Sequence, residues 1–135
     1  MRIIAILTLA VAVIGSGCGS SAGPVANPDS GSAYTVQLHN DGAATLTNLR
    51  VTTGPNVPPL TTASLSPGAS SGPTGVPILH EHPIVALTVN GRSAVFQPVE
   101  GFEGFNARVA PGAYLIRIRY VPEHQTIAAR VEKQP

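Results

Sequence analysis

Alternating apolar and polar residues, interrupted by glycine and proline, make up most of the chain after residue 33. In the longest run, Tyr114–Val121, every second residue from Tyr114 onward is aliphatic or aromatic. A period of two is typical of a strand with one buried face. The chain also holds 14 glycines and 13 prolines, which break helices and mark turns. These features predict an all-β fold.

Turn residues divide the alternating runs into strands. Asn90-Gly91 is the strongest two-residue hairpin signal, and it lies between the runs 84–89 and 92–97. We expect Asn40-Asp41-Gly42 to join the first two strands as a hairpin. A short edge strand around 60–65 should end at Pro67-Gly68. The predicted strands cover residues 34–39, 44–53, 60–65, 84–89, 92–97, 114–121 and 126–131.

This spacing of turns and about seven strands indicates a single antiparallel β-sandwich of the immunoglobulin-like type. Its inward faces should form one apolar core, although the sequence leaves open which face of 84–89 points inward. The expected core residues are Tyr34, Val36, Leu38, Leu46, Leu49, Val51, Leu87, Val89, Phe96, Tyr114, Ile116 and Ile118.

Charge and cysteine content exclude several classes of protein. A formal net charge of +1 provides no basic surface for nucleic acid, so no nucleic-acid partner is expected. The single cysteine, Cys18, can form neither an internal disulfide nor a multi-cysteine zinc or iron–sulfur site. The length of 135 residues limits the chain to one domain.

The first eighteen residues have the layout of a secretory signal. Arg2 precedes the uncharged apolar run Ile3–Ile14, and small residues follow it. The run is too short for a membrane-spanning helix, which needs about 20 apolar residues. Such a segment could be an ordinary cleaved signal with an unrelated cysteine nearby, or an uncleaved anchor.

The segment Gly15-Ser16-Gly17-Cys18 resembles the lipobox of bacterial lipoproteins. Ser16 and Gly17 match its small positions, whereas Gly15 stands where the family usually has an aliphatic residue. The resemblance implies that Cys18 receives a diacylglyceryl group through its sulfur and becomes the acylated N-terminus after cleavage. Gly19 is not the Asp that retains such proteins at the inner membrane, so an outer-membrane location is expected if the organism is Gram-negative.

The domain organisation follows from these two parts. Residues 1–17 are expected to be the signal peptide. Residues 18–32 are expected to be the lipidated cysteine and a flexible tether, because 19–32 are mostly Gly, Ser, Ala, Pro and Asn. Residues 33–135 are expected to be the β-sandwich.

A second resemblance covers much of the expected domain. Its elements are Asn90-Gly91, Phe96-Gln97-Pro98-Val99, Gly101–Gly104 and Pro111-Gly112-Ala113-Tyr114. This layout is similar to that of small uncharacterised bacterial lipoproteins. The resemblance implies a β-sandwich lipoprotein and supplies no activity.

His80-Glu81-His82 is the strongest candidate for a metal site. In an extended segment, residues i and i+2 point to the same side, so both imidazoles could bind zinc or copper. A third ligand could come from His39, Glu123 or His124. The alternative is a solvated pair of histidines before a strand that begins at a proline.

Three further pairs could carry binding or chemistry. Arg117 and Arg119 form either a solvated sheet face or a site for an anionic partner. Phe102 and Phe105 form either a binding tip or a plug at one end of the sandwich. Glu100 and Glu103 could be a carboxylate pair, but no acid–base constellation is legible around them, and we expect no enzyme.

The sequence thus predicts a lipid-anchored protein of the bacterial cell envelope with a non-catalytic binding or structural role. Its expected partners are the membrane, through the lipid on Cys18, and an envelope protein. No catalytic residue and no cofactor are expected. The alternative is a periplasmic metal-binding protein that uses His80 and His82.

Overall fold

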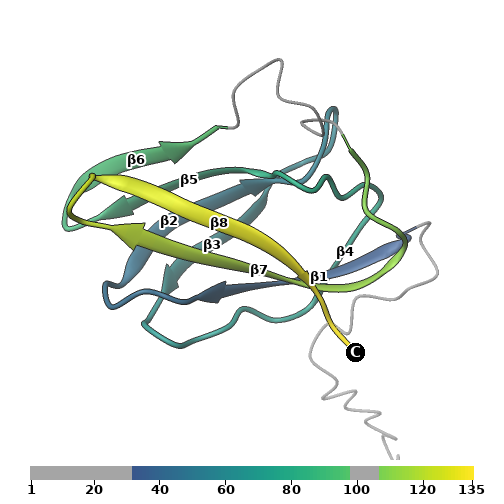
Figure 1. The fold of residues 1–135 in the computed structure, drawn as a ribbon, viewed down its shortest axis with the longest axis horizontal. Coiled ribbons are helices and arrows are strands. Elements are labelled where there is room, and N and C mark those ends of the chain that lie inside the picture. Colours follow the sequence, from purple (N-terminus) through teal and green to yellow (C-terminus); the bar gives the residue numbers. More distant parts are fainter. Residues whose placement is uncertain (1–31, 98–106) are drawn as a thin grey trace, which may run out of the picture.

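The computed structural model describes residues 32–97 and 107–135, which form a β-sandwich of two four-stranded sheets. Figure 1 shows the strands of one sheet lying across those of the other. Sheet A has the order β4-β1-β7-β8 and sheet B the order β3-β2-β5-β6. The strands are β1 (Tyr34–Asn40), β2 (Leu46–Thr52), β3 (Leu60–Leu65), β4 (Thr74–Val76), β5 (Ile84–Val89), β6 (Arg92–Phe96), β7 (Gly112–Val121) and β8 (Thr126–Lys133).

The predicted β-sandwich is confirmed, with two differences in its strands. The short strand β4, which lies between Pro73 and Pro77, was not predicted. The sheets are also not wholly antiparallel, because β1 pairs with β7 in parallel, with Tyr34 opposite Gly112 and Asn40 opposite Ile118. Parallel neighbours need a long connection between them, and here that connection includes all of sheet B.

The expected hairpin between the first two strands is wrong, because β1 and β2 belong to different sheets. The Asn40-Asp41-Gly42 turn instead carries the chain from one sheet to the other. The buried Asn40 amide nitrogen donates to the carbonyls of Ala44 and Leu65, each at 2.8 Å, and its side-chain oxygen accepts from the Gly42 N–H at 3.0 Å. One side chain therefore links the end of β1 to the end of β3 and to the approach to β2.

Local turn and bulge geometry fits the sequence elsewhere. Asn90 and Gly91 have positive φ angles of 49° and 76°, as a tight hairpin between β5 and β6 requires. Asn48 also has a positive φ of 48°, and the register between β2 and β5 shifts between Thr47 and Arg50. This irregularity is a β-bulge, which inserts one extra residue into β2.

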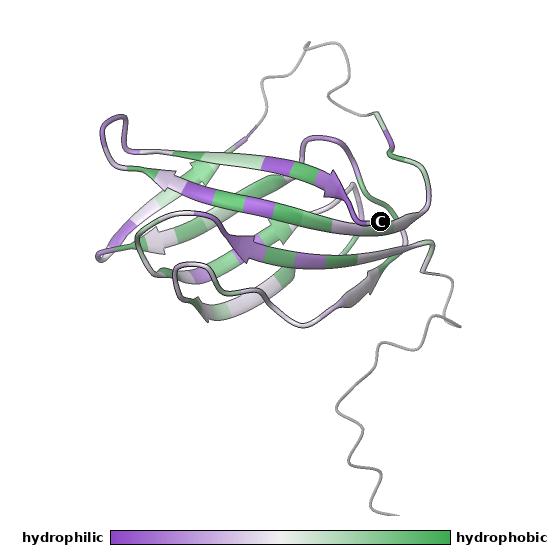
Figure 2. Cartoon of the chain, turned by 60° about the horizontal axis from the view of Figure 1, so that its bottom comes forward, coloured by the Kyte–Doolittle hydropathy of each residue, from purple (hydrophilic) through white to green (hydrophobic). Residues whose placement is uncertain are grey.

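The core lies between the sheets and draws on both of them. Figure 2 shows the alternation of hydrophobic and hydrophilic residues along β7 and β8. All but one of the predicted core residues are buried. The exception, Phe96, is only partly buried, because it ends the edge strand β6. The structure also shows which face of β5 points inward, namely that of Val85, Leu87 and Val89. The hydrophobic core residues beyond the prediction are Leu65, Val76, Leu79, Val85 and Ile127.

The segment before β7 is tied to sheet A by two tyrosines. The Tyr34 hydroxyl donates to the Val109 carbonyl at 2.9 Å, and the Tyr114 hydroxyl donates to the Ala110 carbonyl at 2.7 Å. The two rings lie 6.4 Å apart. Residues 107–111 are thereby held at the end of the sandwich where β1 begins. No helix in the described part of the chain is long and apolar enough to span a membrane.

Replacing Asn40 with alanine should destabilise the fold by about 2–4 kcal/mol, because it leaves two carbonyls and one N–H without their partner. Urea unfolding of the purified chain measures this. The matched control is Gln37→Ala, since the Gln37 amide makes only a 3.5 Å bond to the Ser71 carbonyl. We expect the control to cost less than about 1 kcal/mol. Equal losses in the two variants would contradict the role given to Asn40.

Candidate functional site

His80 lies where three segments meet beside sheet B. The backbone N–H of His80 donates to the Thr53 carbonyl at 2.9 Å, just beyond the end of β2. On its other side His80 pairs with Arg108 in an isolated antiparallel bridge. The neighbouring bonds run from the Glu81 N–H to the Ala107 carbonyl and from the Val109 N–H to the Leu79 carbonyl. The segment before β5 is thus held between the end of β2 and residues 107–109.

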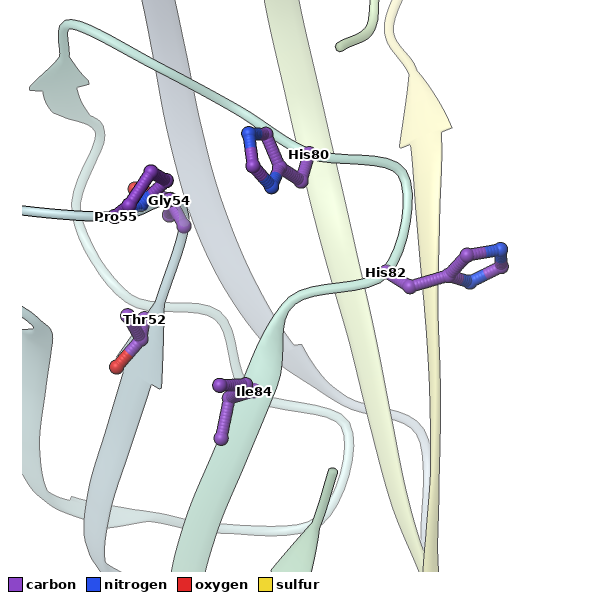
Figure 3. A pocket seen from close by; sticks show the side chains of 7 residues that line it. Thr52, Gly54, Pro55, His80, His82 and Ile84 are labelled. Atoms are coloured by element: carbon purple, nitrogen blue, oxygen red, sulfur yellow. The ribbon is translucent and has the colours of Figure 1, made fainter. Parts of the chain in front are cut away.

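A hollow of about 170 Å³ opens beside this junction, lined by Thr52–Pro55, His80, His82 and Ile84. Figure 3 shows the His80 ring directed toward Gly54 and the His82 ring directed to the other side. Gly54 is required here, because a Cβ at this position would lie 2.6 Å from Cγ2 of Ile78. The absence of a side chain at Gly54 lets the loop after β2 approach the segment that carries His80.

Burial and a nearby positive charge keep the His80 ring neutral. Only 9% of the residue is exposed. Desolvation lowers the pKa of His80, and the positive charge of Arg108 lowers this pKa further. Both effects oppose the protonated form. Burial and the charge of Arg108 therefore favour the neutral form of the His80 ring.

The structure does not bring His80 and His82 together. The chain bends at Glu81 and His82, so the same-side rule for an extended segment does not apply. His39 bonds to the Ser70 hydroxyl at 2.9 Å. Over residues 32–97 and 107–135, no group of three His, Cys, Asp or Glu residues could hold a metal ion. The expectation of a solvated pair is also wrong for His80, since residues 107–109 cover it.

Thr53 was not found by sequence reasoning. Its hydroxyl is the one buried side-chain polar atom in the described residues that lacks a hydrogen-bond partner. The residue is 1% exposed and follows the last residue of β2. No motif marks it, because threonine is common in strands and the missing partner is a property of the packed structure.

Arg117 and Arg119 lie on the outer face of sheet A, as the alternation of β7 predicts. The Arg117 guanidinium donates to Glu132 at 2.6 Å and to Asp41 at 3.2 Å. These carboxylates raise the pKa of Arg117, and the bond to Arg117 lowers the pKa of Glu132. Arg130 stands directly opposite Arg117 in the register, and Glu132 lies between the two positive charges. Arg119 is exposed. Arg117 therefore belongs to an ion-pair network.

The other candidates lie outside the described residues. These are Cys18 with the expected signal and tether, the carboxylates Glu100 and Glu103, and the aromatic pair Phe102 and Phe105.

Comparison with known proteins supports the fold alone. No protein-family model matches the chain, and no curated protein matches it. Among solved structures the chain is similar to a protein from Eubacterium rectale determined by NMR. The two share 14% identity with a TM-score of 0.53, and the match covers 75% of this chain and 89% of that chain.

The burial of His80 predicts that the fold loses stability in mild acid. Below about pH 6.5 the unfolded chain protonates this histidine while the folded chain resists protonation. The unfolded state then binds more protons, so the free energy of unfolding falls as the pH falls. Melting temperatures measured between about pH 7.5 and pH 5 should therefore decrease. His80→Gln should remove part of this decrease, whereas His124→Gln, in an exposed turn, should retain all of it. An unchanged decrease in His80→Gln would contradict the assignment.

The diverging imidazoles predict that zinc and copper do not stabilise the protein through these residues. A metal that bound only the folded state would raise the melting temperature. We expect no rise on titration with either metal, and the same result in the double variant His80→Ala/His82→Ala. A rise that the double variant abolishes would restore the metal-binding alternative.

Proposed function

We propose that this chain is a lipid-anchored protein of the bacterial cell envelope. In this proposal Cys18 carries the lipid, and the β-sandwich has a non-catalytic binding or structural role. One observation carries the proposal. The only cysteine of the sequence directly follows an apolar run and small residues, and it precedes by sixteen positions the first strand, which begins at Tyr34.

The spacing between Cys18 and β1 supports an anchor distinct from the domain. The intervening residues are mostly Gly, Ser, Ala, Pro and Asn, which is the composition of a linker. Lipid chains contribute membrane affinity of about 0.8 kcal/mol per buried methylene, and stable attachment takes more than one chain. A diacylglyceryl group together with an N-terminal acyl chain satisfies that requirement.

The described side chains support a role without catalysis. His80 is buried, and its neighbour His82 points away from it. Arg117 is engaged by Asp41 and Glu132. Arg117 therefore links β7 to β8 and to the turn after β1. A binding role would then fall to the exposed strands and loops of the sandwich.

Metabolic labelling tests the anchor. The full chain is produced in a bacterium supplied with an alkyne-bearing fatty acid, beside the variant Cys18→Ser. We expect the native chain to be labelled, to sediment with membranes, and to lose residues 1–17. Because cleavage in this family follows lipidation, the variant should remain unlabelled and should retain the signal. A native chain that is cleaved but unlabelled would indicate ordinary secretion, and equal labelling of both would also overturn the proposal.

A further inference from the structure

β3 is an edge strand with one open side. In sheet B it pairs with β2 alone. Among the described residues, the one hydrogen bond to its backbone from outside the sheet is that of the Asn40 amide to the Leu65 carbonyl. Its six residues present an edge of about 20 Å. Unpaired N–H and C=O groups along such an edge are a template for another strand.

The other three edge strands are protected in ways that β3 is not. β6 and β8, which end different sheets, lie against one another. β8 also carries Arg130, Glu132 and Lys133. β4 has only three residues. Charge and short length are usual protections of a sheet edge. β3 has prolines beside it, as β4 does, with Pro59 before it and Pro67 after it, but its six residues, Leu-Thr-Thr-Ala-Ser-Leu, include no charge.

Open space borders β3 on both faces of its sheet. A hollow of about 370 Å³ separates Pro59–Thr62 from Ser71, Gly72 and Thr74 on the inner side. A second hollow, of about 320 Å³, lies over Thr61–Ala63 and Asn48–Arg50. The first hollow also reaches Val36 and Leu38 of β1. Among the described residues no backbone hydrogen bond joins segment 71–74 to β3, so the edge is left for an added strand.

The bulge at Asn48 changes which residues of β3 face inward. Inward-facing residues of β3 are those opposite the buried residues of β2, and outward-facing ones are opposite residues exposed at least in part. Along β3 the inward residues are first two positions apart and then three positions apart. The alternation therefore breaks at Ala63, beside Asn48 of β2. Inward are Leu60, Thr62 and Leu65, opposite Val51, Leu49 and Leu46, and outward are Thr61 and Ser64, opposite Arg50 and Thr47.

We propose that β3 is a self-association edge, along which the β3 of a second copy of this chain adds in antiparallel orientation. The register centred between Thr62 and Ala63 uses all six residues. It places Leu60 opposite Leu65 of the second copy, Thr61 opposite Ser64, and Thr62 opposite Ala63 at the centre. Leucine meets leucine and hydroxyl meets hydroxyl, which are favourable cross-strand pairs, and no charge opposes another.

This register is available because of the broken alternation. In a regular six-residue strand, the first and last residues face opposite sides, so the same pairing would set inward residues against outward ones. Here Leu60 and Leu65 both face inward, while Thr61 and Ser64 both face outward. A two-fold axis perpendicular to the sheet then keeps each face continuous at these outer pairs, as an isologous dimer requires, and the break in alternation lies at the axis, where Thr62 stands opposite Ala63.

The association should be weak for free chains. A six-residue edge buries less than the roughly 1,000 Å² expected of a stable interface. Its occupancy in cells rests on the proposed function, because confinement of anchored copies to one membrane raises their effective concentration. The register itself does not depend on the anchor.

Register-specific cysteine cross-linking in producing cells tests the proposal with the full chain. Thr61 and Ser64 are exposed, so cysteines there should leave the fold intact. Within one chain these positions lie about 10 Å apart, too far for a disulfide. In the proposed pair each stands opposite the other position of the second copy. We expect Thr61→Cys/Ser64→Cys to form a disulfide-linked dimer on mild oxidation.

The single variants provide the sharpest control. Thr61→Cys alone and Ser64→Cys alone should each form no disulfide-linked dimer. The two variants should form one when they are produced together. Arg92→Cys/Val95→Cys, with the same spacing at exposed positions of β6, should not dimerise. Dimers from a single variant, equal dimers from the β6 pair, or no dimer at all would overturn the proposal. So would a disulfide to a different protein, which would assign β3 to a heterologous partner.

Two readouts separate this proposal from the proposed anchor. The parental chain carries only Cys18, so a disulfide-linked dimer of that chain would mean a free Cys18 thiol and hence failure of the anchor alone. Sedimentation equilibrium of the unsubstituted chain, with detergent micelles in excess over protein, measures association without any new cysteine. A concentration-dependent dimer is expected, and a monomer at every concentration up to about 1 mM would count against self-association.

Discussion

The hydrogen bonds of Asn40 resolve the main difficulty of this fold, which is how the chain crosses from one sheet to the other immediately after its first strand. Only residues 41–45 separate β1 from β2. The Asn40 side chain is fully buried and bonds to Gly42, Ala44 and Leu65, while its backbone bonds to Gly68 and Ala69. A crossing this short turns backbone groups away from both sheets, and one amide supplies partners for three of them, of which the Leu65 carbonyl is bonded in a buried position. The ends of β1 and β3 and the approach to β2 thereby meet at one buried position.

Local patterns predicted the strands but not all of their neighbours. The alternation in Tyr114–Val121 states which face is buried, and the structure agrees at Tyr114, Ile116 and Ile118. Alternation says nothing about which strand lies alongside, and the parallel partner of β7 is β1, far away in sequence. Asn40-Asp41-Gly42 gives the same turn signal whether the next strand joins the same sheet or the opposite one. β4 is too short to show any period.

The site around His80 could not be predicted for a similar reason. The same-side rule for His80 and His82 assumes an extended backbone, and the chain bends between them. The burial that lowers the pKa of His80 depends on residues 107–109, which are far from His80 in the sequence. Histidine identity and spacing were legible in the sequence. The surroundings that set their chemistry were created only by long-range pairing.

The proposed anchor and the proposed β3 pair are compatible with a symmetric arrangement of two copies at a membrane. Antiparallel pairing of β3 with the faces kept continuous has a two-fold axis perpendicular to sheet B. Where that axis also lies along the membrane normal, both copies sit at the same depth and the sheets lie parallel to the membrane. Residues 19–33 can span up to about 50 Å when extended, which permits this arrangement. In that arrangement the same outer face points toward the lipid in both copies. The outer face of sheet A carries Arg117, Arg119 and Arg130 beside Asp41 and Glu132, and the outer face of sheet B carries Arg50, so either face would bring net positive charge toward lipid phosphates.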